Sequence, residues 1–101
     1  MKGLAEELAG CTGFQWDAGN SGKNEERHGV SDSECEQVFF QRPIRIAPDL
    51  EHSLDESRYA ALGKTAAGRR LTVVFTVRDS LIRVISARPM SRRERRVYDQ
   101  A

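Results

Sequence analysis

LTVVFTVRDSLIRVISAR, residues 71–88, is the stretch of the chain that decides the fold. Over residues 71–78, apolar side chains alternate with others at a period of two, which is the pattern of a half-buried strand. Asp79 and Ser80 form a link short enough for a tight turn, and residues 81–88 make a returning apolar run. We therefore expect an antiparallel hairpin of two long strands.

Helices are marked mainly by their capping residues. Two capping boxes, in which a Ser precedes a Glu by three residues, are present at Ser31 with Glu34 and at Ser91 with Glu94. The second of them begins a last helix that runs toward Tyr98. A weaker helix, interrupted by glycines, is expected over residues 18–28, with Asp17 as its N-cap and Gly29 as its left-handed end.

Shorter strands complete the predicted set, at residues 14–16, 44–47 and 59–63. The order of elements is then β-α-α-β-β-β-β-α. Helices gathered at the ends of a run of hairpin-linked strands predict an α+β fold with a mainly antiparallel sheet flanked by helices. A chain of 101 residues fits one domain. We place that domain at residues 13–101 and expect residues 1–12 to be a flexible leader.

Charge is divided unevenly along the chain, although the net charge is only +1. Residues 1–56 carry 5 Lys and Arg against 12 Asp and Glu, a net charge of −7. Residues 57–101 carry 11 against 3, a net charge of +8, and Lys64 is the only lysine among them. Arginine presents a planar fork of donors that matches a phosphate. The second part is therefore a candidate phosphate-binding surface, most often one for nucleic acid.

Several arginines occupy positions that stability alone would not favour. Arg92 and Arg93 lie in the first turn of the last helix, where the helix dipole opposes positive charge and free amides would bind an anion. Arg83 interrupts an apolar strand, so its charge must face solvent or be held by a partner. A solvated helix and an outward strand face are the alternatives to a phosphate site.

Few other side chains carry candidate chemistry. His52 lies in an acidic loop, residues 48–56, and is either a candidate general acid or base or a solvated side chain. His28 is expected at a helix end. The neighbouring carboxylates of Asp55 and Glu56 are interpreted as surface charge.

The sequence also excludes some classes of site and location. Cys11 and Cys35 have no metal-binding spacing, so we expect free thiols and no metal site. No P-loop or dinucleotide fingerprint is present. No apolar run reaches the roughly 18 residues of a membrane helix. Met1–Gly10 lacks the apolar core of a secretory signal, so we expect a cytoplasmic protein with no membrane contact.

From Phe14 to about Tyr98, the sequence resembles the BrnT family of toxins. The motifs that carry the resemblance are Phe14-Gln15-Trp16-Asp17, Arg27-His28-Gly29-Val30, and Ile82-Arg83-Val84-Ile85-Ser86-Ala87-Arg88 followed by Arg92-Arg93-Glu94-Arg95. The last motif is the most specific, because a short motif such as His-Gly-Val alone is weak. The resemblance covers nearly the whole chain.

The resemblance implies a RelE-like fold and the function of a type II toxin that cleaves RNA and so inhibits translation and growth. It also implies a BrnA-type antitoxin as partner. Operator DNA would then be bound only through the toxin–antitoxin complex. No cofactor is implied.

On this resemblance we expect a metal-independent endoribonuclease. The 2′-hydroxyl of the RNA substrate attacks the adjacent phosphate and expels the 5′-oxygen. Fixed cationic donors would stabilise the charge that builds on the phosphorane oxygens. Arg83 and Arg88 are the expected phosphate clamps, with Arg58 as a third donor.

Other candidate residues have supporting roles. His52 and His28 are the candidates for the general base, and Tyr98 is a further catalytic candidate, because RelE-like toxins can cleave with arginine, lysine and tyrosine alone. The residues expected to hold the RNA backbone are Arg78, Arg92, Arg93 and Arg96.

Two other functions would need the same arginines. One is a non-catalytic nucleic-acid-binding module, which retains labelled RNA without cleaving it. The other is a docking surface for an acidic partner, which binds that partner in a salt-sensitive way and has no affinity for RNA.

Overall fold

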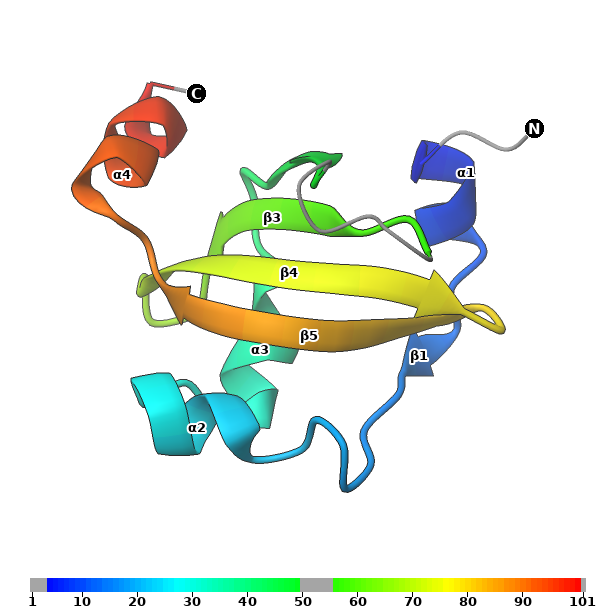
Figure 1. The fold of residues 1–101 in the computed structure, drawn as a ribbon. Helices are drawn as coiled ribbons and strands as arrows, with labels where there is room; N and C mark the ends of the chain where they lie inside the picture. Colours follow the sequence, from blue (N-terminus) through cyan, green and yellow to red (C-terminus); the bar gives the residue numbers. More distant parts are fainter. Residues whose placement is uncertain (1–3, 50–55, 101) are drawn as a thin grey trace.

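The computed structural model describes residues 4–49 and 56–100 of the chain (Figure 1). The described residues form four helices and five strands. The helices are α1 (Leu4–Ala9), α2 (Lys23–His28), α3 (Asp32–Val38) and α4 (Arg92–Asp99). The strands are β1 (Gly13–Phe14), β2 (Arg45–Pro48), β3 (Tyr59–Lys64), β4 (Arg70–Arg78) and β5 (Leu81–Pro89). None of the described helices is long and apolar enough to cross a lipid bilayer.

The strands form one sheet in the order β1-β5-β4-β3-β2. Neighbouring strands are antiparallel, except that β1 runs parallel to β5. The expected α+β class is confirmed, but the sheet is mixed. The parallel pair arises because the chain passes through two helices and three more strands before β5 returns to lie beside β1.

The predicted hairpin is confirmed as β4 and β5. Asp79 and Ser80 have φ angles of 51° and 62°, and a two-residue type I′ turn requires positive φ at both positions. Val74 pairs with Ser86 and Phe75 with Val84, so one extra residue of β5 forms a bulge between them. The bulge lets the hairpin keep its apolar face on the core on both sides of this point.

Helix α3 packs on one face of the sheet, against β3 and β4, and α2 lies along β5 (Figure 1). The core between the layers includes Val38 of α3 and the strand residues Val73, Phe75 and Val84, all completely buried. Gly63 of β3 allows α3 to approach closely, because a Cβ atom there would lie 2.6 Å from Cγ1 of Val38.

Both predicted capping boxes are present. The hydroxyl of Ser31 accepts a hydrogen bond from the Glu34 amide at 3.1 Å, and that of Ser91 does the same with the Glu94 amide at 3.1 Å. These bonds satisfy amides that the first turn of a helix leaves free. The starts of α3 and α4 are therefore set by local sequence.

The prediction of a helix over residues 18–28 is wrong in its first half. Helix α2 begins only at Lys23, after Gly22 with a φ of 74°. Asp17 is not its N-cap; the Asp17 carbonyl instead accepts the amide of Asn20 at 3.1 Å in a turn. Gly29 ends the helix in the left-handed conformation, with a φ of 67°, as expected.

The segment before β1 contains helix α1, and its Leu8 and Cys11 pack against the core. The first strand is shorter than the expected residues 14–16, because it pairs with β5 only over Gly13 and Phe14. Both cysteines are free thiols, as expected. Burial raises the pKa of the Cys35 thiol to about 12, so this side chain is inert packing rather than a nucleophile.

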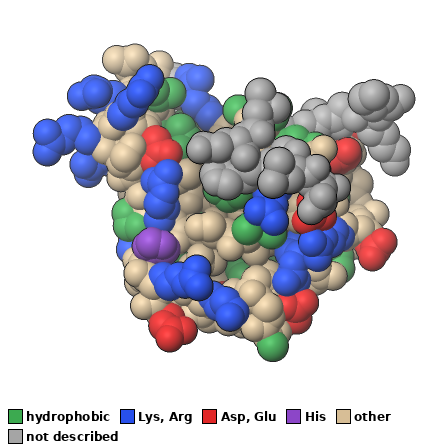
Figure 2. Space-filling model, in the orientation of Figure 1, with side chains coloured by type: hydrophobic (Ala, Val, Ile, Leu, Met, Phe, Trp, Pro, Cys, Tyr) green, Lys and Arg blue, Asp and Glu red, His purple; other side chains and the backbone are tan. Residues whose placement is uncertain are grey.

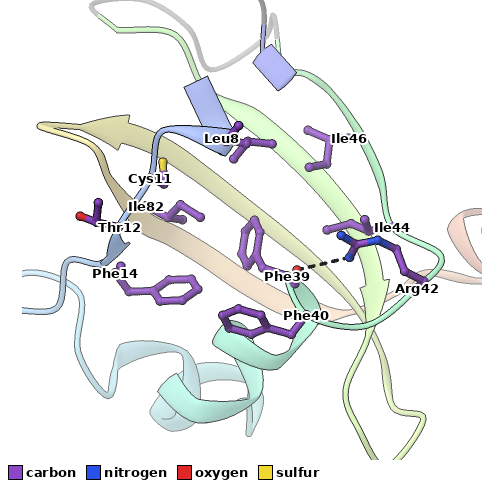
Figure 3. A pocket seen from close by; sticks show the side chains of 12 residues that line it. Leu8, Cys11, Thr12, Phe14, Phe39, Phe40, Arg42, Ile44, Ile46 and Ile82 are labelled. Carbon is purple, nitrogen blue, oxygen red and sulfur yellow. Dashed lines mark hydrogen bonds between the residues drawn. The ribbon is translucent and has the colours of Figure 1, made fainter. Parts of the chain in front are cut away.

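An apolar cavity of about 440 Å³ lies between α1, β1, the end of α3 and β2 (Figure 3). Phe14, Phe39 and Ile46 line it, and the exposed ring of Phe40 stands at its side. Arg42 also lines it, but the guanidinium donates to backbone carbonyls, including that of Phe39 at 3.4 Å. The described lining of this cavity includes no carboxylate or histidine.

Candidate functional site

The strand arginines project from the side of the sheet opposite α3. Thr76 of β4 faces Arg83 across the ladder, and Thr72 faces Arg88. Arg78 follows Thr76 by two residues, so all three arginines share one face, here called the arginine face. In Figure 2, Lys and Arg side chains crowd over α4 and are spaced across this face, with Asp and Glu side chains beside several of them.

Arg83 is held by the turn that follows β1. Its guanidinium donates to the Asp17 carboxylate at 2.8 and 3.2 Å and to the side-chain oxygen of Gln15 at 3.1 Å. The buried side chain of Asn20 fixes this turn by donating to the carbonyl of Val84 at 3.1 Å. Only 13% of the Arg83 side chain is exposed. Arg83 is thus locked in place by a carboxylate, and the hydrogen bond from Arg83 lowers the pKa of Asp17.

Arg78 is paired with Glu56. Nε of Arg78 donates to Oε2 of Glu56 at 2.9 Å, and Nη2 donates to Oε1 at 2.7 Å. The hydroxyl of Thr76 donates to the carbonyl of Ser57 at 2.8 Å, which lays residues 56–58 against the arginine face. The hydrogen bond from Arg78 lowers the pKa of Glu56, and the charges of Arg58 and Arg83 act in the same direction.

At the far end of β5, Arg88 is paired with Glu94 of α4. Its two terminal nitrogens donate to the carboxylate at 2.7 and 3.0 Å, and the amide of Ser91 donates to the same group at 2.8 Å. The hydrogen bond from Arg88 lowers the pKa of Glu94 to about 2, and the bond from Ser91 adds to this effect. Arg88 therefore ties the start of α4 to the sheet.

Helix α4 presents four cations that have no carboxylate partner within the described part of the chain. They are Arg92, Arg93, Arg95 and Arg96, all exposed. Tyr98 on the other side of the helix is 4% exposed, and its hydroxyl donates to the carbonyl of Pro43 at 2.6 Å. An ion pair between Arg70 and Asp99 adds a second tether. Tyr98 therefore anchors α4, because its ring is buried and its hydroxyl already donates to a backbone carbonyl.

Neither histidine candidate is brought into the arginine face by the described contacts. His52 falls outside the described residues. His28 is exposed at the last position of α2, beside the Gly29 cap. Within residues 4–49 and 56–100, no three His, Cys, Asp or Glu side chains are close enough together to hold a metal ion.

The structure groups the predicted arginines into two sets on the same face. Arg58, Arg78 and Arg83 lie near Glu56, whose pKa all of them lower, and Arg88 lies with α4. Sequence reasoning missed the carboxylates of Asp17 and Glu56, because a helix cap and a surface charge explain them locally. Of the three carboxylates, only Glu94 belongs to a motif that can be recognised in the sequence, the capping box at the start of the last helix.

A comparison with protein families places this face in context. The family model described as the ribonuclease toxin BrnT of type II toxin–antitoxin systems matches residues 16–94. The chain belongs to the BrnT family. As a BrnT toxin it is a ribonuclease, and the type II system implies an antitoxin partner. The matched range includes Asp17, Glu56, Glu94 and the strand arginines, whereas α1 and Asp99 lie outside it. No curated protein sequence matches the chain.

Proposed function

We propose that this BrnT toxin is a metal-independent endoribonuclease and that the arginine face is its RNA-cleaving site. The observation that carries the proposal is the common placement of Arg78, Arg83 and Arg88 on one side of the sheet, beside the exposed arginines of α4. RNA cleaved at this site would no longer serve translation, which accounts for growth inhibition. The antiparallel β2–β5 meander with a C-terminal helix is consistent with a RelE-like fold.

In this proposal, the arginines accelerate cleavage mainly by stabilising negative charge in the transition state. The 2′-hydroxyl attacks the neighbouring phosphorus, and negative charge builds on the phosphorane oxygens. Arg58, Arg78 and Arg83 would donate hydrogen bonds to those oxygens, and Arg88 would hold the next part of the strand. Arg78 and Arg88 lie in partly exposed pairs, and each guanidinium has further N–H groups with which it can bind a phosphate beside its carboxylate.

Helix α4 would hold the RNA backbone outside the cleavage point. Arg92, Arg93 and Arg96 are exposed on it, and its start is fixed to the sheet by Arg88. Contacts of this kind are indifferent to sequence and strongly dependent on salt. Tyr98 would act through the position of α4 rather than on the substrate.

The partner and the location follow from the same assignment. A BrnA-type antitoxin would neutralise the toxin by covering the arginine face, and operator DNA would be bound only through that complex. The expected place of action is the cytoplasm, where RNA substrates are abundant.

The test compares Arg83→Ala and Arg88→Ala with the wild type, using labelled RNA in the presence of EDTA. Loss of one preorganised charge donor typically lowers kcat by about 10²–10³-fold, and we expect a loss of this size for Arg83→Ala. Arg88→Ala should weaken cleavage and also loosen α4. Full activity in both variants would contradict the assignment, and RNA retained by the wild type without cleavage products would favour the non-catalytic module.

A further inference from the structure

We propose that Glu56 is the general base of this site and removes the proton from the attacking 2′-hydroxyl. The inference rests on the proposed function and supplies the proton acceptor that the arginines cannot provide. It depends on where the carboxylate lies, paired with Arg78 and within electrostatic reach of Arg58 and Arg83.

The position of Glu56 is fixed from two directions. Arg78 grips both carboxylate oxygens, at 2.7 and 2.9 Å. The next residue, Ser57, is fixed by the hydroxyl of Thr76, whose partner across the ladder is Arg83. A phosphate bound by Arg78 and Arg83 would therefore lie next to the Glu56 carboxylate, where the 2′-oxygen of the preceding nucleotide also has to be.

The other carboxylates of the arginine face are already committed to structural roles. Asp17 accepts two hydrogen bonds from Arg83 and one from the amide of Gly19. Glu94 accepts from Arg88 and from the amide of Ser91, which it needs to cap α4. Among the contacts described for Glu56, the only donor is Arg78, so each oxygen keeps a lone pair for a substrate hydroxyl.

Substrate binding would itself strengthen this base. In the free protein, three arginines hold the pKa of Glu56 below its usual range, so the carboxylate is ionised before RNA arrives. A phosphate that accepts hydrogen bonds from the remaining N–H groups of Arg78 and Arg83 offsets part of their charge. The pKa of Glu56 then rises in the complex, and the carboxylate becomes a better proton acceptor when the 2′-hydroxyl is in place.

The bond changes of the step balance without a further reactant except water. The 2′-oxygen forms a bond to phosphorus while its proton passes to Glu56. The bond from phosphorus to the 5′-oxygen breaks, and that oxygen takes a proton from water. The products are a 2′,3′-cyclic phosphate and a 5′-hydroxyl end, and Glu56 returns its proton to the solvent.

The test is Glu56→Gln, which keeps a hydrogen-bond acceptor beside Arg78 but cannot take a proton. Single-turnover cleavage should fall by about 10²–10⁴-fold, the usual contribution of general acid–base catalysis. Affinity for an RNA with a 2′-deoxy group at the cleavage site should stay the same or increase, because a negative charge has been removed from the site. Glu25→Gln on α2, an exposed glutamate outside the arginine face, is the control and should leave both quantities unchanged.

The pH dependence gives an independent readout. In the wild type, the acid limb of kcat should lie at higher pH than the acid limb of kcat/KM, because the first reports the complex and the second the free protein. Glu56→Gln should lose this limb. If the wild type cleaves and Glu56→Gln cleaves equally fast, the assignment of Glu56 is wrong and the proposed function stands. If the wild type binds RNA without cleaving it, both proposals are wrong.

Discussion

Asp17, Glu56 and Glu94 each neutralise an arginine that the sequence marked as a phosphate ligand. Their effect is to hold the guanidinium groups in fixed orientations before any RNA is bound. Positioned donors of this kind lose little entropy when the transition state forms. The sequence identified the arginines because their residue type and spacing are visible locally. It could not identify Asp17 and Glu56 as their partners, since those pairs exist only after the chain has folded.

The pair between Arg88 and Glu94 makes a prediction for stability against pH. The pKa of Glu94 is about 2 in the folded protein, against 4.5 for an ordinary glutamate. A carboxyl group whose pKa is lowered by folding stabilises the fold above its unfolded pKa and loses this contribution as the pH falls through the folded value. Stability owed to Glu94 should therefore disappear between about pH 5 and pH 2.

Urea unfolding of the wild type and of Glu94→Gln at a series of pH values measures this contribution. The Glu94 side chain is 25% exposed, and solvent screening reduces the expected difference to about 1–2 kcal/mol. The wild type should lose that much more free energy of unfolding than the variant between about pH 6 and pH 2. Parallel curves for the two proteins would show that the pair does not stabilise α4.

At the scale of elements, the sequence correctly predicted those helices and strands that depend on residues close together in the chain. The hairpin followed from alternation and a two-residue link, and α3 and α4 followed from their capping boxes. Helix α2 was predicted too long, because Asn20 is buried and used to bind Gln15 and Val84 rather than to continue a helix. The parallel pairing of β1 with β5 joins residues nearly 70 positions apart, and no local pattern encodes it.

Helix α4 and its anchor provide a test at this scale. Tyr98→Phe removes the hydrogen bond to the carbonyl of Pro43 but keeps the buried ring. We expect the free energy of unfolding to fall by about 0.5–1.5 kcal/mol, the usual value of such a bond. The single-turnover cleavage rate should be unchanged, because the hydroxyl is placed as an anchor. A large loss of cleavage with unchanged stability would instead make Tyr98 a catalytic residue.

For the molecule as a whole, the acidic first part and the basic second part of the sequence do not remain separate in space. Asp17 and Glu34 from the first part pair with Arg83 and Arg69 from the second. From the charge asymmetry alone, one would expect the strand arginines to be unpaired. In the folded protein, carboxylates of the first part neutralise two of them. Within the described part of residues 57–101, the cations without a carboxylate partner are Lys64 of β3 and the four exposed arginines of α4.

This distribution predicts which residues set the salt dependence of RNA binding. Each phosphate contact on single-stranded RNA adds about 0.7 to the slope of log affinity against log salt concentration. Replacing Arg92, Arg93 and Arg96 together by alanine should therefore reduce that slope by about 2. The measurement is fluorescence anisotropy with a labelled RNA that carries a 2′-deoxy group at the cleavage site, at four or more salt concentrations. Lys23→Ala on α2, which packs against β5 and lies apart from α4 in Figure 1, should keep the wild-type slope. An unchanged slope in the triple variant would mean that RNA contacts the strand arginines and not α4.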